Sequence, residues 1–153
     1  MKPHPLALAA ENGLDVASQA GDPDSVLAFW RRMLQFRRGR GGKADGDDAQ
    51  KGYKRLLVYG NFRDLRPEDR DLFVFVKEPH DGEGLDRDGE RLLVVLNFTA
   101  EEKSWEVPGD EELGGPPGEH GGARELLLIM STYPGKVEKG KLEPFEGQVY
   151  LVR

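Results

Sequence analysis

Two apolar runs, Leu72-Phe73-Val74-Phe75-Val76 and Leu92-Leu93-Val94-Val95-Leu96, carry the clearest structural signal in this sequence. Both consist of β-branched, aromatic and leucine residues, and both have the length of a strand rather than of a core helix. Turn-forming residues bound them: Arg66-Pro67-Glu68-Asp69 precedes the first run, and Pro79 to Gly89 separates the two. We therefore expect two buried strands joined by a loop.

Runs of the same kind continue to the C-terminus. They lie at 56–59, leading into 60–65, and at 104–107, 126–130 and 149–152. No helical pattern lies between them, so the crossover helices of a parallel sheet are not expected. Short strands at this spacing predict an antiparallel β-sandwich over residues 55–153, and the fold class is therefore mainly β.

Three of the predicted strands, at 72–76, 92–96 and 126–130, are apolar on both faces. A sheet that exposes one face to water should alternate between apolar and polar residues. Either these strands are central and lie under loops, or something else covers one of the sheets.

One amphipathic α-helix is predicted ahead of the strands, at about residues 23–38, with Asp22 as its N-cap and Pro23 at its first position. Its apolar stripe consists of Val26, Phe29, Trp30, Met33, Leu34 and Phe36. No partner for these large side chains is evident in the sequence. Residues 1–21 are expected to be irregular, and residues 39–54 a flexible surface insertion.

Composition excludes several classes of function. A chain of 153 residues accommodates one domain, or one domain with an appendage. Its formal net charge of −6 argues against binding to nucleic acid or to an anionic membrane. Cysteine is absent, which excludes disulfides, thiolate metal sites and a cysteine nucleophile. No apolar run is long enough to span a bilayer and no signal peptide is visible, so a cytoplasmic location is expected.

Residues that could support catalysis or metal binding are scattered. His4, His80 and His120 lie in Pro/Gly-rich loops without a second ligand three or four residues away, so no zinc site is predicted. The acidic residues between 81 and 90 match a calcium loop only in composition. Asn97-Phe98-Thr99 is a formal glycosylation sequon, expected to be unused because it directly follows a strand. We predict no catalytic, cofactor-binding or metal-binding residue, and no cofactor.

Seven stretches, taken in order, point to one enzyme family. They are Asp15–Gln19, Asp22–Leu27, Phe29–Arg37, Leu57–Phe62, Phe73–Phe75, Leu93–Phe98 and Leu142–Leu151. Together they resemble the C-terminal end of α-glucosidases of the α-amylase superfamily of glycoside hydrolases, in the fungal form of the maltase, isomaltase and oligo-1,6-glucosidase branch. No single stretch is diagnostic, but the ordered series is specific.

The resemblance implies a catalytic (β/α)₈ barrel followed by a β-sandwich. Residues 1–38 would then be the remnant of the barrel's end, and residues 55–153 the C-terminal sandwich. The full-length family hydrolyses terminal α-linked glucose from maltose- or isomaltose-type oligosaccharides with carboxylates on barrel strand ends, about 5–5.5 Å apart in a retaining enzyme. None of the motifs around those carboxylates occurs here, so the chain alone is expected to be inactive.

The partner implied by the resemblance is the barrel of the parent enzyme, whose N-terminus would lie outside this sequence. The contact would run through Val26, Phe29, Trp30 and Met33, and self-association through the same helix face is the alternative.

A second function stays open, that of a free-standing β-sandwich that binds carbohydrate or another partner. Such a module would present a row of exposed aromatic residues, for which Trp105, Tyr59 and Tyr133 are the best candidates. Burial in a core or a domain interface is the commoner fate of such residues, and we favour it. Nothing in the sequence supports an independent enzyme of another kind.

Overall fold

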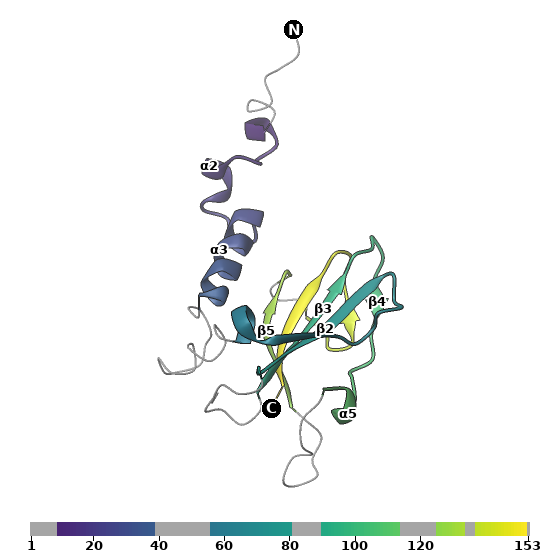
Figure 1. Ribbon diagram of the computed structural model, residues 1–153. Coiled ribbons are helices and arrows are strands. Elements are labelled where there is room, and N and C mark those ends of the chain that lie inside the picture. The colour runs from purple at the N-terminus through teal and green to yellow at the C-terminus, as the bar shows by residue number, and fades with distance from the viewer. Residues whose placement is uncertain (1–8, 39–55, 81–89, 114–124, 134–136, 153) are drawn as a thin grey trace.

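The computed structural model describes residues 9–38, 56–80, 90–113, 125–133 and 137–152. Its main feature is a five-stranded sheet in the order β1-β2-β3-β7-β5, in which every pair of neighbours is antiparallel. A second sheet has two antiparallel strands, β4 and β6. The predicted mainly β, antiparallel fold is confirmed (Figure 1).

The strands of the large sheet are β1 (Asn61–Asp64), β2 (Leu72–Glu78), β3 (Arg91–Asn97), β5 (Leu126–Ser131) and β7 (Gly147–Val152). Those of the small sheet are β4 (Lys103–Ser104) and β6 (Lys141–Leu142), and the helices are α2 (Val16–Gln19), α3 (Val26–Arg37) and α5 (Asp110–Leu113). In the described ranges no helix is both long enough and apolar enough to cross a bilayer.

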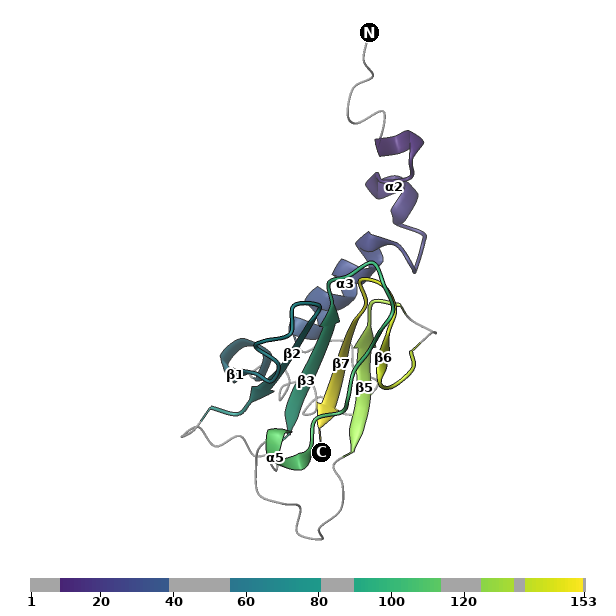
Figure 2. The same ribbon diagram turned by 90° about the vertical axis from the view of Figure 1, so that its right-hand side faces the viewer.

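One face of the large sheet packs against the two-stranded ribbon of β4 and β6, and we call it the ribbon-side face. Leu72, Val74, Leu93, Val95, Tyr150 and Val152 of the large sheet form one core with Trp105, Leu113 and Leu142. The last three belong to the chain around β4, α5 and β6, which lies over this face in Figure 2. The two layers are therefore held together by apolar burial, as in a β-sandwich.

The opposite, helix-side face of the same strands forms a second core. Leu92, Val94, Val149 and Leu151 meet Phe36 from the last turn of α3 and Leu56 from a helical turn at 56–59. The central strands β3 and β7 are thus buried on both faces, which accounts for their continuous apolar sequence. The edge strand β5 differs, because Leu127 and Leu128 remain 47% and 37% exposed.

The start of the helix differs from the sequence expectation. Helix α3 begins at Val26, and Ser25 rather than Asp22 is its N-cap, since Ser25 Oγ accepts a hydrogen bond from Ala28 N at 3.2 Å. Asp22 accepts instead from Asp24 N at 2.9 Å, in the turn that contains Pro23. The helix therefore begins three residues later than expected, and the cap predicted at Asp22 is wrong.

The strand predicted at 56–59 is wrong, because these residues form a helical turn. The turn ends at Gly60, whose N–H donates to Leu56 O at 3.0 Å. A Cβ at this position would lie 2.4 Å from Leu56 O and 2.8 Å from Glu78 O. Glycine is therefore what allows the helical turn to pass directly into β1.

Other short elements were not predicted at all. They are α2 in a segment expected to be irregular, α5 in the loop after Pro108, and the two-residue strand β6. The strand predicted at 104–107 is reduced to Lys103–Ser104. The insertion expected at 39–54 lies outside the described residues.

Candidate functional site

The helix-side surface is the first candidate site. We define it by two groups of residues, the first on α3 (Val26, Phe29, Trp30, Met33 and Leu34) and the second on the sheet (Phe62, Phe73 and Phe75). On the helix, Val26, Trp30 and Leu34 are 62%, 58% and 47% exposed, while Phe29 and Met33 are half-buried. The predicted contact residues therefore keep much of their apolar surface in water.

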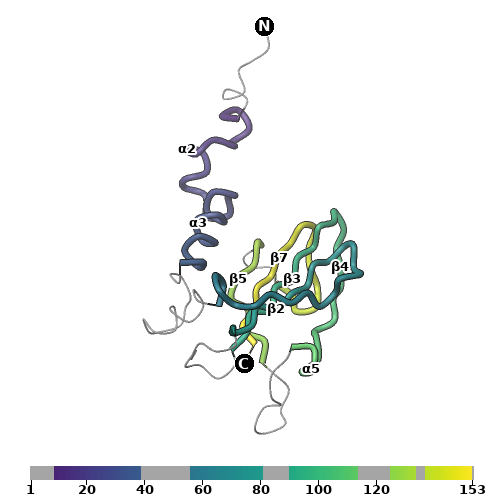
Figure 3. The backbone as a smooth tube through the Cα atoms, viewed as in Figure 1, coloured from purple at the N-terminus to yellow at the C-terminus, as the bar shows by residue number. Residues whose placement is uncertain are grey.

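Among the described residues, helix α3 contributes its C-terminal turn to the helix-side core of the sheet. Phe36 is 5% exposed and packs in the helix-side core, whereas the N-terminal turns of the helix extend beyond the sheet together with α2 (Figure 3). Gln19 Oε1 accepts from Leu27 N at 3.0 Å and so links α2 to the start of α3. The exposed apolar stripe therefore lies on a helix whose first turn is held by a hydrogen bond from the preceding helix.

Three phenylalanines continue the apolar surface on the sheet. The ring centroids of Phe62 and Phe75 are 5.1 Å apart, those of Phe73 and Phe75 5.0 Å, and those of Phe62 and Phe73 5.9 Å. Phe62 is 54% exposed, and Phe73 and Phe75 are half-buried. An aromatic cluster left open in this way is typical of a surface that another apolar surface covers.

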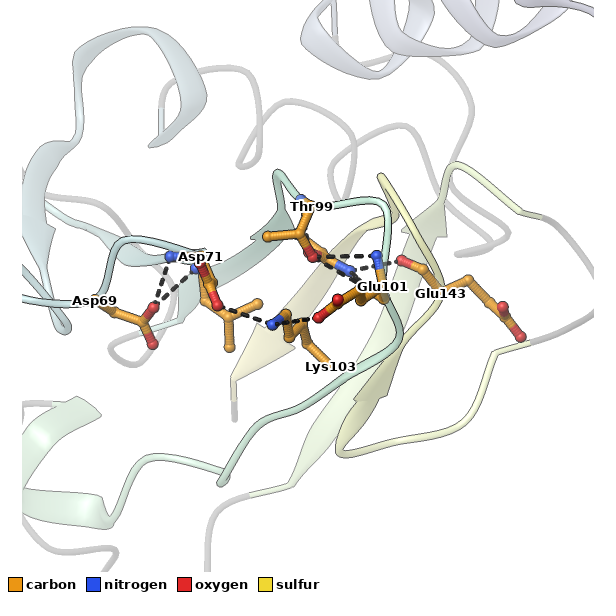
Figure 4. A network of polar contacts seen from close by, with 8 residues as sticks. Asp69, Asp71, Thr99, Glu101, Lys103 and Glu143 are labelled. Atoms are coloured by element: carbon orange, nitrogen blue, oxygen red, sulfur yellow. Dashed lines mark hydrogen bonds and ion pairs between the residues drawn. The ribbon is translucent and has the colours of Figure 1, made fainter.

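A polar network at one end of the large sheet contains Asn97, the asparagine of the glycosylation sequon. Asn97 is 2% exposed, and its Nδ2 donates to Glu101 O at 2.8 Å and to Glu143 O at 2.9 Å. Its Oδ1 accepts from Thr99 N at 2.9 Å and from Thr99 Oγ at 2.8 Å (Figure 4). The amide is committed to joining β3 to the turn before β7, so it is not a glycosylation acceptor in the folded chain.

Charged groups beside this network form a surface clamp. Lys103 Nζ lies 2.8 Å from Asp71 Oδ2 and 3.2 Å from Glu101 Oε2, and its hydrogen bonds to these two carboxylates raise the pKa of Lys103. Asp69 Oδ1 accepts from Leu72 N and Asp71 N, both at 2.9 Å, and these backbone bonds lower the pKa of Asp69. The clamp fixes the start of β2 against β4.

A buried carboxylate, Glu146, ties the other strands together. It is 2% exposed; its Oε1 accepts from Ser131 Oγ at 2.8 Å and Gln148 Nε2 at 3.0 Å, and its Oε2 from Glu143 N at 2.8 Å. Tyr150 donates to Gln148 Oε1 at 2.6 Å. Burial, and secondly the charge of Glu146, raise the pKa of Tyr150 to about 12. Each of these groups is used in holding β5, β6 and β7 in register.

The other candidates from the sequence do not come together. His80 Nδ1 lies 2.9 Å from Asn61 Oδ1 at the exposed start of β1. His4, His120 and the acidic residues of 81–89 lie outside the described part of the chain. Among the described residues, no three His, Asp or Glu side chains are grouped so that they could hold a metal ion.

Trp105, Tyr59 and Tyr133, the three residues considered for carbohydrate binding, do not form a row of exposed side chains. Trp105 is only 7% exposed and packs against Tyr150 in the ribbon-side core, with ring centroids 5.7 Å apart. Tyr59 is 71% exposed but stands on the helical turn at 56–59. Tyr133 is 43% exposed and donates its hydroxyl to Pro144 O at 3.0 Å. The preference for core packing is confirmed for Trp105.

Sequence reasoning missed the Glu146 network. The partners of Glu146 are 3, 2 and 15 residues away, in a turn and two different strands. No spacing rule relates them, so the only available signal was the position of a carboxylate next to a predicted strand.

Comparison with known proteins gives the context for this geometry. No protein-family model matches the chain. An α-glucosidase of Saccharomyces cerevisiae, MAL32, is 32% identical over 145 residues, which cover 94% of this chain and 19% of the yeast protein. A probable oligo-1,6-glucosidase of Bacillus subtilis is 26% identical over 141 residues, or 91% of this chain and 19% of the relative.

Solved structures agree on the fold. The trehalulose synthase MutB of Pseudomonas mesoacidophila superposes with a TM-score of 0.59 at 24% identity, over 91% of this chain and 20% of the synthase. The chain therefore spans about a fifth of the length of the relatives it matches. With nearly its whole length it is related to the α-glucosidases and oligo-1,6-glucosidases of the α-amylase superfamily.

Proposed function

We propose that this chain is the non-catalytic C-terminal part of an α-glucosidase and that it packs on the catalytic (β/α)₈ barrel of that enzyme. In this proposal residues 1–38 complete the barrel and residues 55–153 form the accessory sandwich. The observation that carries it is the helix-side surface, which is apolar, partly uncovered and continuous with a core that already buries Phe36. The matched fifth of the relatives supports the same arrangement.

The energetic argument concerns the exposed helix stripe. Fully burying a large apolar side chain stabilises a protein by roughly 1.5–3 kcal/mol relative to leaving it exposed. Trp30 and Val26 are more than half exposed, so most of this stabilisation is unrealised in the chain by itself. A barrel surface laid against α3 and the phenylalanine cluster would realise it, as interdomain packing does in other multidomain proteins.

The chain itself supplies structure rather than chemistry in this proposal. Its buried carboxylate, Glu146, is enclosed in hydrogen bonds, and Asp71 and Glu101 share Lys103 at the surface. A retaining glycosidase needs two facing carboxylates in a cleft. We therefore expect no hydrolysis of a nitrophenyl α-glucoside by the purified chain, with the activity residing in the barrel, and we expect the cytoplasm to be its location.

The proposal is tested by a chimera. The region of the yeast α-glucosidase that matches this chain is replaced by residues 1–153, and hydrolysis and thermal unfolding are measured. We expect an active chimera in which Trp30→Gln lowers the free energy of unfolding by about 1.5–3 kcal/mol, against about 1 kcal/mol in the isolated chain. Val107→Thr, at a 41% exposed position on the ribbon side, is the matched control and should act equally in both.

Equal effects of Trp30→Gln in the chimera and in the isolated chain would count against barrel packing. The alternative use of the same surface is self-association, which size-exclusion chromatography with light scattering distinguishes. A stable dimer that Trp30→Gln dissociates, together with an inactive chimera, would favour a free-standing interaction module.

A further inference from the structure

The apolar stripe that remains exposed on α3 ends among arginines. Its last member, Leu34, is 47% exposed and follows Trp30 by four residues, so the two lie on one face of the helix. Arg31 lies three residues before Leu34, and Arg37 and Arg38 lie three and four residues after it, so all three are its neighbours on the helix surface. The three arginines are exposed.

These arginines lack a negatively charged partner in the part of the chain that the structure describes. None of the ion pairs formed there involves Arg31, Arg37 or Arg38. The sequence offers no close candidate either, since residues 25–38 contain four arginines and no Asp or Glu. The chain as a whole has a formal net charge of −6. The border of the stripe is therefore a local concentration of positive charge on an acidic protein.

The dipole of the helix explains only part of this pattern. Cations stabilise the last turn of a helix, because the backbone carbonyl groups there carry partial negative charge. Arg37 and Arg38 are in that position, but Arg31 lies six residues before the end of α3. Its neighbour Arg32 donates through Nη1 to Pro23 O at 2.6 Å. Among the described residues, neither the dipole nor a side-chain hydrogen bond accounts for Arg31.

We infer that the surface that covers α3 is apolar at its centre and bordered by carboxylates that pair with Arg31 and Arg37. The inference rests on the barrel packing proposed above, and it specifies the chemistry of the barrel surface that would meet this helix. Charge complementarity favours such a surface, because a neutral or basic one would remove water from the guanidinium groups without replacing it. Carboxylates suit arginine in particular, since its planar fork pairs with both oxygens of the group.

The chimera with the yeast α-glucosidase tests this pairing. Arg31→Gln removes the charge and Arg31→Lys keeps it. Arg70→Gln is the matched control, because Arg70 is an exposed arginine in the turn before β2 and forms none of the described ion pairs. The midpoint of urea unfolding is measured by circular dichroism at about 0.01 M and about 1 M salt, between which the Debye length falls from about 30 Å to about 3 Å.

We expect Arg31→Gln to lower the midpoint at low salt further in the chimera than in the isolated chain, and high salt to remove most of that difference. Arg31→Lys should keep most of the midpoint, and Arg70→Gln should act equally in both proteins. If Trp30→Gln destabilises the chimera more than the isolated chain, yet Arg31→Gln acts like Arg70→Gln at both salt concentrations, then the barrel covers α3 without supplying carboxylates and the inference is overturned. Equal effects of Trp30→Gln in the two proteins overturn barrel packing, and this inference with it.

Measurements on the isolated full chain keep the inference falsifiable if the chimera does not fold. The probes are an apolar sulfonate dye, 8-anilinonaphthalene-1-sulfonate, and a neutral dye of similar size, N-phenyl-1-naphthylamine. We expect Arg31→Gln to weaken binding of the sulfonate dye roughly two- to fivefold at low salt and to leave the neutral dye unchanged. Equal weakening by Arg70→Gln would show that only overall charge matters, which overturns the role of Arg31. A salt-sensitive dimer that Arg31→Gln dissociates would assign the carboxylates to a second copy of the chain instead of the barrel.

Discussion

Two aromatic residues on the same helix, Trp30 and Phe36, should respond very differently to substitution. Phe36 is 5% exposed and belongs to the helix-side core, whereas Trp30 is 58% exposed and lies about 1.7 turns earlier on α3. If α3 is anchored only by its last turn, then Phe36→Ala damages the domain and Trp30→Gln scarcely does. The pair therefore measures where the core of this chain ends.

The expected magnitudes follow from burial. Phe36→Ala removes a buried ring and leaves a cavity, which costs about 3–5 kcal/mol of unfolding free energy. Trp30 has about two-fifths of its side chain covered, and two-fifths of the at most 3 kcal/mol for full burial is about 1 kcal/mol. Glutamine is a slightly better helix former than tryptophan, which offsets a few tenths of that loss.

Urea unfolding gives both values. In Trp30→Gln the remaining tryptophan is Trp105, so its fluorescence reports on the ribbon-side core alone, and circular dichroism reports on the whole sheet. We expect coincident transitions and improved solubility for Trp30→Gln, because an exposed apolar group is removed. A loss above about 3 kcal/mol for Trp30→Gln would refute the reasoning, since α3 would then be core along its whole length.

Tyr150→Phe should lower the free energy of unfolding by about 1–3 kcal/mol at neutral pH, because Gln148 Oε1 loses its donor. The substitution should also make the decrease of stability at alkaline pH less steep. The pKa of Tyr150 is about 12 in the fold and about 10 unfolded, so the unaltered chain loses stability as pH rises between these values, and below pH 10 the contribution is fully present; identical alkaline limbs in pH-dependent urea titrations would contradict this. Asp69→Ala should cost about 1 kcal/mol at pH 7, and the difference from the unaltered chain should shrink as pH falls through the lowered pKa of Asp69, below its usual 3.8. Thermal unfolding across that range measures it, and a difference that persists in acid would exclude the carboxylate as the cause. Gly60→Ala should cost about 1–3 kcal/mol, because its Cβ meets backbone oxygens of Leu56 and Glu78; Gly21→Ala, which meets nothing within 4 Å, is the control.

The parts of the fold that were predictable are those with many residues in one pattern. The strands at 72–76, 92–96, 126–130 and 149–152 were identified because each run is long enough to show its composition and its bounding turns. The helical turn at 56–59 was mistaken for a strand because a four-residue apolar run fits either state. Gly60 marks the end of the helical turn, but glycine is needed there because Glu78 O approaches closely. That contact arises from the tertiary structure and cannot be read from the sequence.

The candidate sites were predictable only where apolar residues are spaced along one element. The stripe on α3 could be read from the sequence, yet the sequence could not distinguish Phe36, which is covered, from Val26, which is not. The polar sites were out of reach for a different reason. Glu146 meets Ser131 of β5 and Gln148 of β7, so the network depends on sheet order rather than on sequence spacing.

The gradient of burial along α3 connects the fold to the proposed function. A helix that belonged wholly to the sandwich would bury its stripe from end to end, and a helix that belonged wholly to another body would leave Phe36 exposed as well. On the face of α3 that carries Phe29, Met33 and Phe36, the first two are half-buried and the last is 5% exposed, so burial increases towards the C-terminal end. On the neighbouring face, Val26, Trp30 and Leu34 remain 62%, 58% and 47% exposed. A single continuous helix with one end in each environment would couple the two bodies rigidly, because bending it would break backbone hydrogen bonds. In the proposed enzyme, α3 would therefore couple the folding stability of the sandwich to that of the barrel.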